Sequence, residues 1–174
     1  HPMTFTFALR SHAPQAASPL LQCAALCYRI RGSKLQLLLI TSRSGRRWTL
    51  PKGWPMPGRS MAESAAREAW EEAGVRGRLQ GGCAGSYIYR KRHSPHPHMA
   101  MVFPLEVTGL DKRFPERGQR KRRWLSRRRA AALVHEPDLA RLLLQFDPDE
   151  LGSTPILTFG PHSPDQGGPS GFSS

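Results

Sequence analysis

Three carboxylates occur close together in residues 67–72, whose sequence is REAWEE. In a helix, Glu68 and Glu72 would share a face, because residues four apart are neighbours, and Glu71 would lie beside them. Carboxylates this close repel one another unless a cation lies among them. Mg²⁺ suits such a site, since it binds carboxylate oxygens, keeps several waters and is completed by substrate phosphates. Arg67, four residues before Glu71, can orient that carboxylate through an ion pair.

The charge distribution of the chain favours a cation site at the same place. The 174 residues include 26 Lys and Arg and 13 Asp and Glu, which gives a net charge of +13. Such a charge attracts nucleic acid, an anionic membrane surface or small polyphosphates. No acid precedes Glu63, yet four of the 13 lie between Glu63 and Glu72. This concentration indicates a cation site, with a solvated acidic face laced by i,i+4 pairs as the alternative.

A loop rich in glycine and proline leads into the segment that carries these carboxylates. Residues 51–58 contain three prolines and two glycines, and such a loop can bring backbone groups to a phosphate or a metal. Ser60 and Glu63 fit a capping box, in which each side chain satisfies a free N–H group of the other residue. The alanines that follow favour a helix over about residues 61–73, which Gly74 ends.

Residues 53–75 resemble the Nudix box, whose pattern is G, five residues, E, seven residues, R-E-U-x-E-E-x-G-U, with U an aliphatic residue. The matching positions are Gly53, Arg67, Glu68, Glu71, Glu72, Gly74 and Val75, with Ala69 at a U position. One element departs from the pattern, because Arg59 stands where the first Glu is expected. The resemblance implies an α+β Nudix fold, in which a mixed sheet lies between helices in an α/β/α sandwich.

Further motifs are similar to the diphosphoinositol polyphosphate phosphohydrolase-like branch of that family. They are Trp48 to Gly53, Tyr89 to Arg92, Val102 to Leu105 and Arg120 to Leu125, and the resemblance covers roughly residues 20–146. Members of this branch act on diphosphoinositol polyphosphates and on diadenosine polyphosphates. The resemblance therefore implies metal-dependent hydrolysis of a phosphoanhydride bond in a nucleoside-diphosphate-X type substrate, with one of these two compounds expected.

By the same resemblance, Glu68 and Glu72 are expected to bind Mg²⁺ or Mn²⁺. Glu71 and a backbone carbonyl near Lys52 or Gly53 would assist them. The implied reaction is attack of a metal-activated water on a bridging phosphorus, with Glu71, Glu72 and Arg67 as the catalytic residues. The sequence leaves the general base open between Glu71, Glu106 and Glu116.

Phosphate recognition is expected from arginine and lysine side chains that face the pocket, because a guanidinium can donate two N–H groups to phosphate oxygens. The expected substrate-binding residues are Arg43, Arg46, Arg47, Lys52, Arg90 and Arg92, with Lys91 beside the last two. Trp54, in the loop, is a candidate for stacking on a substrate ring, whereas Trp48 and Trp70 are expected in the core. The histidines at 93, 96 and 98 alternate with prolines, which favours a rigid polar turn over a second metal site.

Residues 112–129 contain ten Lys or Arg and one acid, Glu116. This run supports the alternative function, a non-catalytic protein that binds a polyanion or RNA on a Nudix scaffold. Against it stand the small number of interleaved aromatic residues and the lack of a recognised nucleic-acid motif. A basic face that steers anionic substrates is the simpler interpretation, so nucleic acid is a less favoured partner than a small polyphosphate.

The remaining segments give the domain organisation. We expect an N-terminal segment over residues 1–20, with a tag remnant at 1–2, a Nudix domain over 21–146 and a mobile tail over 147–174, where 15 of 28 residues are Pro, Gly or Ser. Within the domain, the expected strands are 22–30, 35–41, 48–50, 85–92, 99–107 and 122–125. The expected helices are 61–73, 126–134 and 137–146.

Composition sets the expected compartment. No apolar run approaches the roughly 20 residues of a membrane helix, and no secretory signal is evident in residues 4–20. Cys23, Cys27 and Cys83 form neither an even disulfide framework nor a metal pattern, so free thiols, buried for the first two, are expected. These features favour the reducing cytoplasm and no membrane association, and they leave the oligomeric state open.

Overall fold

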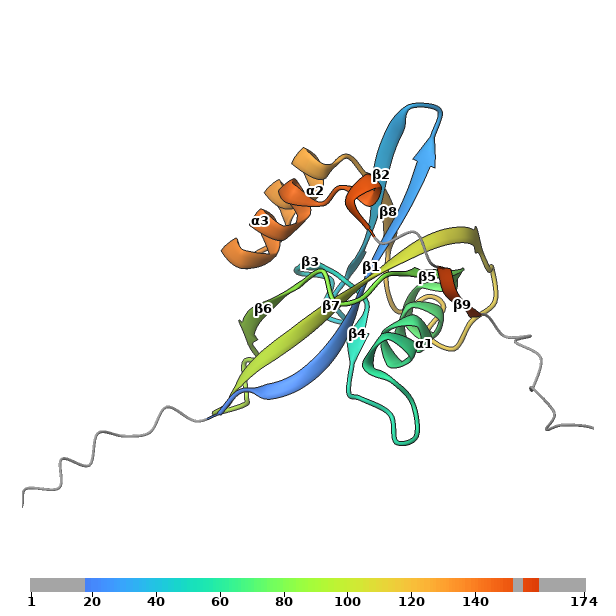
Figure 1. The fold of residues 1–174 in the computed structure, drawn as a ribbon. Helices are drawn as coiled ribbons and strands as arrows, with labels where there is room; N and C mark the ends of the chain where they lie inside the picture. The colour runs from blue at the N-terminus through green and yellow to red at the C-terminus, as the bar shows by residue number, and fades with distance from the viewer. Residues whose placement is uncertain (1–17, 152–154, 160–174) are drawn as a thin grey trace, which may run out of the picture.

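One mixed sheet is the centre of the structure (Figure 1). The computed structural model describes residues 18–151 and 155–159, and within these residues nine strands join the sheet. The strands are β1 (Leu20–Arg31), β2 (Lys34–Thr41), β3 (Trp48–Thr49), β4 (Lys52–Gly53), β5 (Val75–Gln80), β6 (Gly85–Arg90), β7 (Pro97–Leu110), β8 (Arg122–Leu125) and β9 (Pro155–Phe159).

The strands follow the order β3-β2-β1-β7-β5-β9, and β8 pairs with β2, β4 with β1 and β6 with β7. The pair β1–β7 is parallel and runs from Leu20 opposite His98 to Tyr28 opposite Glu106, whereas the other ladders are antiparallel. The predicted hairpin is confirmed, since β1 and β2 pair antiparallel up to Arg31 opposite Lys34. Strand β1 is longer than predicted by two residues at its start and one at its end, and β2 is longer by one residue at its start.

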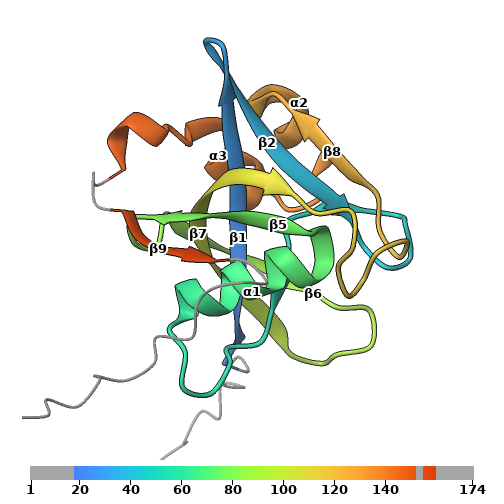
Figure 2. The same cartoon turned by 90° about the vertical axis from the view of Figure 1, so that its right-hand side faces the viewer.

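Helices cover both faces of the sheet, as Figures 1 and 2 show. Helix α1 (Met61–Ala73) packs on one face through its buried alanines, against Cys23, Cys27 and Leu38. Helices α2 (Arg127–Leu133) and α3 (Pro137–Gln145) pack on the other face, where Leu139 and Leu143 are fully buried. The predicted α+β sandwich with a mixed sheet between helices is therefore confirmed.

Helix α1 has the bounds that the sequence predicts. The Ser60 hydroxyl accepts a hydrogen bond from the Glu63 N–H at 3.1 Å, which is the first half of the predicted capping box. Gly74 ends the helix in the left-handed conformation, with φ of 66°, and its N–H donates to the Trp70 carbonyl at 2.8 Å. These two caps fix where the carboxylates of α1 stand relative to the loop before it.

Three strands were not predicted: β4, which lies in the predicted loop, β5 and β9. The alternation of buried and exposed residues in β5 is that of a half-buried strand, although a glycine inside a short segment is more typical of a turn. Gly77 lies so close to β7 that an added Cβ would overlap the Glu106 carbonyl. The unpredicted strand β9 pairs with β5, and a 3₁₀-helix, η1 (Pro148–Glu150), precedes it.

These two elements lie within the segment predicted as a mobile tail from residue 147, and the mobility of that segment stays a prediction. Edge pairing with β5 satisfies backbone groups whatever the side chains are, which is why composition did not reveal β9. The rest of the predicted tail, residues 152–154 and 160–174, lies outside the described residues, as do residues 1–17 of the N-terminal segment.

Candidate active site

A cavity of about 690 Å³ lies between β4, the loop before α1 and the side of α1 that carries Glu68, Glu71 and Glu72. Glu68, Glu71 and Glu72 all line this cavity, so the structure brings the three predicted carboxylates together. Its other lining residues come from β1, from residues 43–57 and from residues 91–120: Gln22, Arg43, Leu50, Lys52, Gly53, Trp54, Pro55, Met56, Pro57, Lys91, Glu116 and Arg120.

Glu72 is the most enclosed of the three carboxylates and is only 7% exposed. Its Oε2 accepts a hydrogen bond from the backbone N–H of Lys52 at 3.1 Å, and its Oε1 lies 3.2 Å from Nη2 of Arg120. Burial raises the pKa of Glu72 to about 7, although Arg120 and the bond from Lys52 act in the opposite direction. The carboxylate is therefore fixed in position and receptive to a further cation.

Glu68 stands one helical turn before Glu72, against β4. The approach is so close that a Cβ added to Gly53 would overlap the Glu68 carboxylate, which explains why glycine occupies this position. Burial, followed by the charges of Glu72 and Glu71, raises the pKa of Glu68 to about 7. Repulsion among carboxylates thus remains uncompensated at Glu68.

Glu71 is oriented as the sequence predicts. Its Oε1 accepts a hydrogen bond from Nε of Arg67 at 2.9 Å, and the Arg67 guanidinium also lies over the Trp70 ring. Trp70 in turn donates from Nε1 to Asp111 at 3.2 Å. Trp70 is therefore a packing residue, as expected, and it supports the ion pair that holds Glu71.

Arg120, which is distant in sequence from the three carboxylates of α1, also lines the cavity. Its side chain is 10% exposed and lies 3.2 Å from Glu72 and 3.3 Å from Glu116, while Nη1 donates to the Thr41 carbonyl at 3.2 Å. Glu116 also pairs with Arg43 at 3.2 Å. Sequence reasoning missed the role of Arg120, because it reads as one member of a basic run. Arg120 and Glu72 are 48 positions apart in the sequence, so their contact is evident only in the folded structure.

Lys52 is partly buried beside Glu72. Its Nζ donates to the Thr49 hydroxyl at 3.0 Å and lies 4.8 Å from the centre of the Tyr89 ring. Burial lowers the pKa of Lys52 to about 8, although Glu72 acts against this effect. Lys52 therefore contributes a backbone N–H to Glu72 and a positive charge to the cavity wall.

The residues of this cavity fit a divalent cation. Among residues 18–151, no three His, Cys, Asp or Glu side chains converge into a ready-made metal site. Mg²⁺ does not require one, since it is usually bound by one or two carboxylates together with waters and substrate phosphates. Glu68 and Glu72 supply such a pair, and burial is the main cause of the raised pKa of each carboxyl.

A second, basic cleft of about 1010 Å³ adjoins the cavity and shares Lys91 with it. Four of the predicted substrate-binding residues, Arg46, Arg47, Arg90 and Arg92, line this cleft with Lys91, and three serines complete the lining. Arg43, Lys52 and Trp54 instead line the carboxylate cavity. The predicted phosphate-binding residues therefore fall into two adjacent groups.

Trp54 is half-exposed at the mouth of the cavity. Its ring centre lies 5.7 Å from that of His98, and Nζ of Lys91 lies 5.5 Å from it. His98 does not belong to the predicted polar turn but to β7, where it is 2% exposed and also contacts Tyr89. Lys91 therefore lies over part of the surface that Trp54 would offer to a substrate ring.

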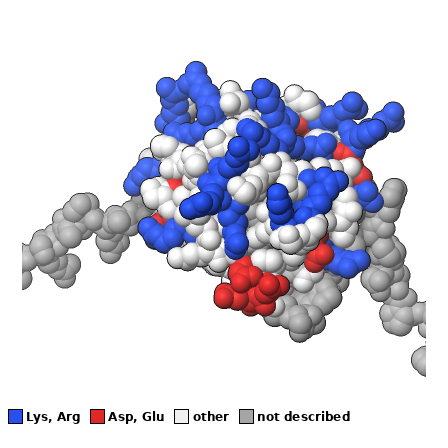
Figure 3. All heavy atoms as spheres, turned by 90° about the horizontal axis from the view of Figure 1, so that it is seen from above, with Lys and Arg blue, Asp and Glu red and all other residues white. Residues whose placement is uncertain are grey.

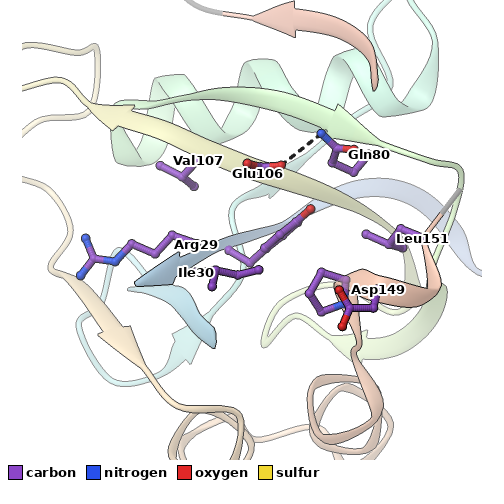
Figure 4. A pocket seen from close by; sticks show the side chains of 9 residues that line it. Arg29, Ile30, Gln80, Glu106, Val107, Asp149 and Leu151 are labelled. Carbon is purple, nitrogen blue, oxygen red and sulfur yellow. Dashed lines mark hydrogen bonds between the residues drawn. The ribbon is translucent and has the colours of Figure 1, made fainter. Parts of the chain in front are cut away.

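Glu106, a candidate general base, lies in a different cavity of about 390 Å³ (Figure 4). There it accepts a hydrogen bond from Gln80 at 3.3 Å and lies across from Asp149 of η1. This cavity shares no lining residue with the carboxylate cavity. The other two candidates for the general base, Glu71 and Glu116, line the carboxylate cavity. Arg59, which replaces the first Glu of the box, is exposed in the loop before α1.

The mixed sheet between helices, with three carboxylates of one helix in a cavity beside the loop that precedes it, defines the class of protein. The NUDIX domain model matches residues 20–146. The chain therefore belongs to the Nudix family, as the sequence predicted.

Relatives within the family include the branch that the sequence predicted. Diphosphoinositol polyphosphate phosphohydrolase 3-alpha of Homo sapiens is 32% identical over 150 residues, which make up 83% of this chain and 87% of that protein. Nudix hydrolase 4 of Arabidopsis thaliana is 37% identical over 92 residues, 53% of this chain and 44% of that protein. The chain spans between 44% and 59% of the length of three such Arabidopsis relatives.

Solved structures agree on the fold. An Ap4A hydrolase of C. elegans matches with a TM-score of 0.58 over 72% of this chain and 93% of that chain, at 22% identity, which shows the fold alone. Within the described residues, no helix is long and apolar enough to cross a membrane. Cys23 and Cys27 are buried free thiols, as predicted, and Cys83 is free and exposed.

Proposed function

We propose that this protein is a pyrophosphohydrolase that cleaves a phosphoanhydride bond in a densely phosphorylated small molecule, with Mg²⁺ or Mn²⁺ as cofactor. The observation that carries the proposal is the position of Glu68 and Glu72 in one cavity beside a cleft lined by five Lys and Arg. The carboxylates suit a cation and the cleft suits phosphates, so the bond to be cut would lie where the two meet.

The chain's own residues would prepare the reaction. Glu68 and Glu72 would hold a divalent cation, which would supply an activated water and neutralise charge on the leaving phosphate. Lys52 and Arg120 fix the Glu72 carboxylate, and Arg67 fixes Glu71. Glu71 or Glu116 would accept the proton of the attacking water, since both line the cavity.

A diphosphoinositol polyphosphate fits the basic cleft better than a dinucleotide does. Five positive side chains line the cleft, and its lining includes neither an aromatic residue nor an acid. A compound with phosphates on every side would use all of these charges, whereas a linear polyphosphate between two bases would not. The lack of an aromatic lining gives a base no surface for stacking.

Diadenosine polyphosphate remains a second candidate because of Trp54. Its ring is 50% exposed at the cavity mouth and could accept an adenine if Lys91 moved away. Lys91 is exposed, so such movement costs little. The two candidates thus depend on different residues.

The first experiment tests hydrolysis itself. Phosphate release would be measured from diphosphoinositol pentakisphosphate, diadenosine tetraphosphate and ADP-ribose, with Mg²⁺ and with EDTA. Turnover should require the metal, and Glu72→Gln should lower kcat by about 100-fold or more, because metal-assisted charge stabilisation contributes several kcal/mol and about 1.4 kcal/mol is a factor of ten. A folded protein that cleaves none of these compounds would overturn the proposal.

The second experiment separates the two substrates. Arg46→Gln combined with Arg92→Gln should raise KM for diphosphoinositol pentakisphosphate, whereas Trp54→Ala should leave it nearly unchanged. The opposite pattern, with the larger loss from Trp54→Ala and diadenosine tetraphosphate as the better substrate, would select the dinucleotide.

A further inference from the structure

Four charged side chains form a series of ion pairs that leads from the protein surface to the carboxylate cavity. Arg43, whose side chain is 73% exposed, lies 3.2 Å from Oε1 of Glu116. The same oxygen lies 3.3 Å from Nη2 of Arg120, and this nitrogen lies 3.2 Å from Oε1 of Glu72. The buried end of the series is therefore Glu72, one of the two expected metal ligands.

The guanidinium of Arg120 is shared among several acceptors and is still not fully hydrogen-bonded. Its Nη2 lies between the carboxylates of Glu72 and Glu116, while Nη1 donates to the Thr41 carbonyl at 3.2 Å. Its Nε is buried and has no hydrogen-bond partner among the described residues. A buried donor without a partner costs free energy. A further acceptor that entered the cavity and reached this guanidinium would therefore stabilise it.

Glu72 has both of its oxygens engaged by the protein, but the two partners differ in how firmly they are held. Oε2 accepts a hydrogen bond from the Lys52 backbone N–H, which is fixed because Lys52 of β4 pairs opposite Ala24 of β1. Oε1 faces the end of the long Arg120 side chain, which has many rotamers and lines an open cavity. Arg120 is therefore the partner of Glu72 that can move.

Arg120 and a divalent cation are alternatives at Oε1 of Glu72, because both are positively charged. Two cations a few ångströms apart repel each other more strongly inside a protein than in water. The side chains of Arg120 and Glu72 are only 10% and 9% exposed, so solvent screens this repulsion little. Burial raises the pKa of Glu72 to about 7 although Arg120 lowers it, so one guanidinium does not compensate this carboxylate fully. A divalent cation would compensate it better.

An anion in the cavity would change this competition. The polyphosphate proposed as substrate offers pairs of oxygens, to which a guanidinium donates two hydrogen bonds at once. The net charge of +13 attracts anions, and Figure 3 shows Lys and Arg spread over one face of the protein, while acidic side chains gather mainly in one compact group. A phosphate group that took over Arg120 would leave Oε1 of Glu72 to the cation.

We propose that Arg120 couples metal binding to substrate binding, a role that rests on the function proposed above. Without an anion in the cavity, Arg120 stays at Glu72 and lowers the affinity of the site for a divalent cation. When an anion binds, Arg120 transfers to it and the cation gains Glu72. Arg120 is thus a positioning residue that acts through Glu72, and the cation and the anion each favour the binding of the other.

A purely structural role for Arg120 would have the opposite effect. If Arg120 only held Glu72 in the correct place, its removal would weaken metal binding, as the loss of support for a metal ligand usually does. If Arg120 competes with the metal, its removal strengthens metal binding. The direction of the change therefore separates the two roles, and it does not depend on enzymatic activity.

The test measures the binding of Mn²⁺ to the full-length protein by electron paramagnetic resonance of the free ion. It is done at about pH 8.5, above the pKa of about 7 of Glu68 and Glu72, so that protons do not compete with the metal. Each protein is titrated with and without sulfate as the anion, at an ionic strength matched with chloride.

The test variant is Arg120→Gln. Its matched control is Arg141→Gln, which removes the same charge from an exposed pair with Asp138 on α3. Arg120→Lys is the second variant, and it decides the question if Arg120→Gln does not fold. Lysine keeps the charge but has one nitrogen for the acceptors that Arg120 contacts with two.

Without sulfate, Arg120→Gln should bind Mn²⁺ about 10-fold more tightly than the wild type, which is a typical size for the coupling between two sites. Arg120→Lys should bind it more tightly by a smaller factor, and Arg141→Gln should keep the wild-type affinity. Sulfate should strengthen Mn²⁺ binding to the wild type and to the control. It should not do so for Arg120→Gln, because this variant has no guanidinium to transfer.

Three results would overturn the coupling and leave the proposed function intact. Weaker or unchanged Mn²⁺ binding by the Arg120 variants would mean that Arg120 does not compete with the metal. Equal strengthening in Arg141→Gln would mean that only net charge matters. An effect of sulfate that persists in Arg120→Gln would show that the anion acts through other residues. A wild-type protein that binds no Mn²⁺, with or without sulfate, would overturn both the coupling and the metal-dependent function.

Discussion

Two carboxylates in the cavity are raised in pKa toward neutrality, so protons and metal ions compete for them. Burial raises the pKa of Glu68 and of Glu72 to about 7 each. A metal ligand must be deprotonated, and metal binding at neutral pH would therefore release protons. The affinity for Mg²⁺ is expected to rise between about pH 6 and pH 8 for this reason.

The raised pKa of Glu68 also links stability to pH. Its folded pKa of about 7 exceeds the ordinary 4.5, so its contribution to stability is fully present below about pH 4.5 and is lost as pH rises through 7. In EDTA, the Tm of wild-type protein should fall more between pH 5 and pH 8 than that of Glu68→Gln, which cannot titrate. Added Mg²⁺ at pH 8 should raise Tm for the wild type more than for the variant. Equal pH slopes in the two proteins would contradict the expectation.

Gly53 is required for the position of Glu68. A Cβ at this position would overlap the Glu68 carboxylate. Gly53→Ala should therefore lower kcat/KM by about 10 to 100-fold, the usual effect of disturbing the support of a metal ligand. The matched control is Gly82→Ala, where an added Cβ meets no atom within 4 Å. Similar activity in both variants would show that Glu68 can move without loss.

The sequence was enough to predict the acidic residues of the Nudix box, but it did not reveal Arg120, which contacts one of them. Glu68, Glu71 and Glu72 were predictable because a helical period places them together. Arg120 was not, since 48 residues separate it from Glu72 and nothing in a basic run marks one arginine as internal. The role of Arg120 depends on the position of the loop before β8, which only the packed sheet determines.

At the scale of elements, Gly74 joins α1 to the loop that follows β7. It adopts φ of 66°, and an added Cβ would lie 2.6 Å from the Phe114 ring and 2.8 Å from the Asp111 carbonyl. The end of α1 and residues 111–114 therefore pack together only because no side chain separates them.

Gly74→Ala should therefore destabilise the protein more than a simple change of backbone preference does. Gly32→Ala is the matched control, since its φ of 63° is similar and it has no atom within 4 Å of an added Cβ. The control should cost about 1 kcal/mol for the left-handed backbone, and Gly74→Ala about 2 to 4 kcal/mol once the overlap is added. Urea unfolding of both variants measures the difference, and equal losses would mean that the contact relaxes freely.

Elements with strong local signals were predicted, and those that depend on neighbours were not. Helix α1 has both caps and a run of alanines, so its bounds were predicted correctly. Strand β5 was missed because its glycine resembles a turn, although that glycine serves the close approach to β7. Strand β9 was missed because its pairing with β5 depends on the backbone and not on composition.

At the scale of the whole molecule, the net charge of +13 should accelerate the encounter with an anionic substrate. Raising ionic strength from about 50 to 200 mM should lower kcat/KM several-fold, since the field is screened beyond about 10 Å at 0.1 M, while kcat should change little. Initial rates at low and at saturating substrate give the two constants. A fall in kcat with constant kcat/KM would show that salt acts on the chemical step and not on the encounter.

The parallel pairing of β1 with β7 has a consequence for how the protein folds. Leu20 pairs with His98, and Tyr28 with Glu106, at a separation of 78 positions along the chain. Helix α1, β4 and most of the cavity lie within this loop, so the carboxylates gather only after its ends have met. Closing a loop of this length costs entropy before any contact repays it, which slows folding to the millisecond-to-second range of non-local topologies. On the ribosome, β1 can pair with β2 first, but its parallel ladder with β7 forms only after β7 has emerged.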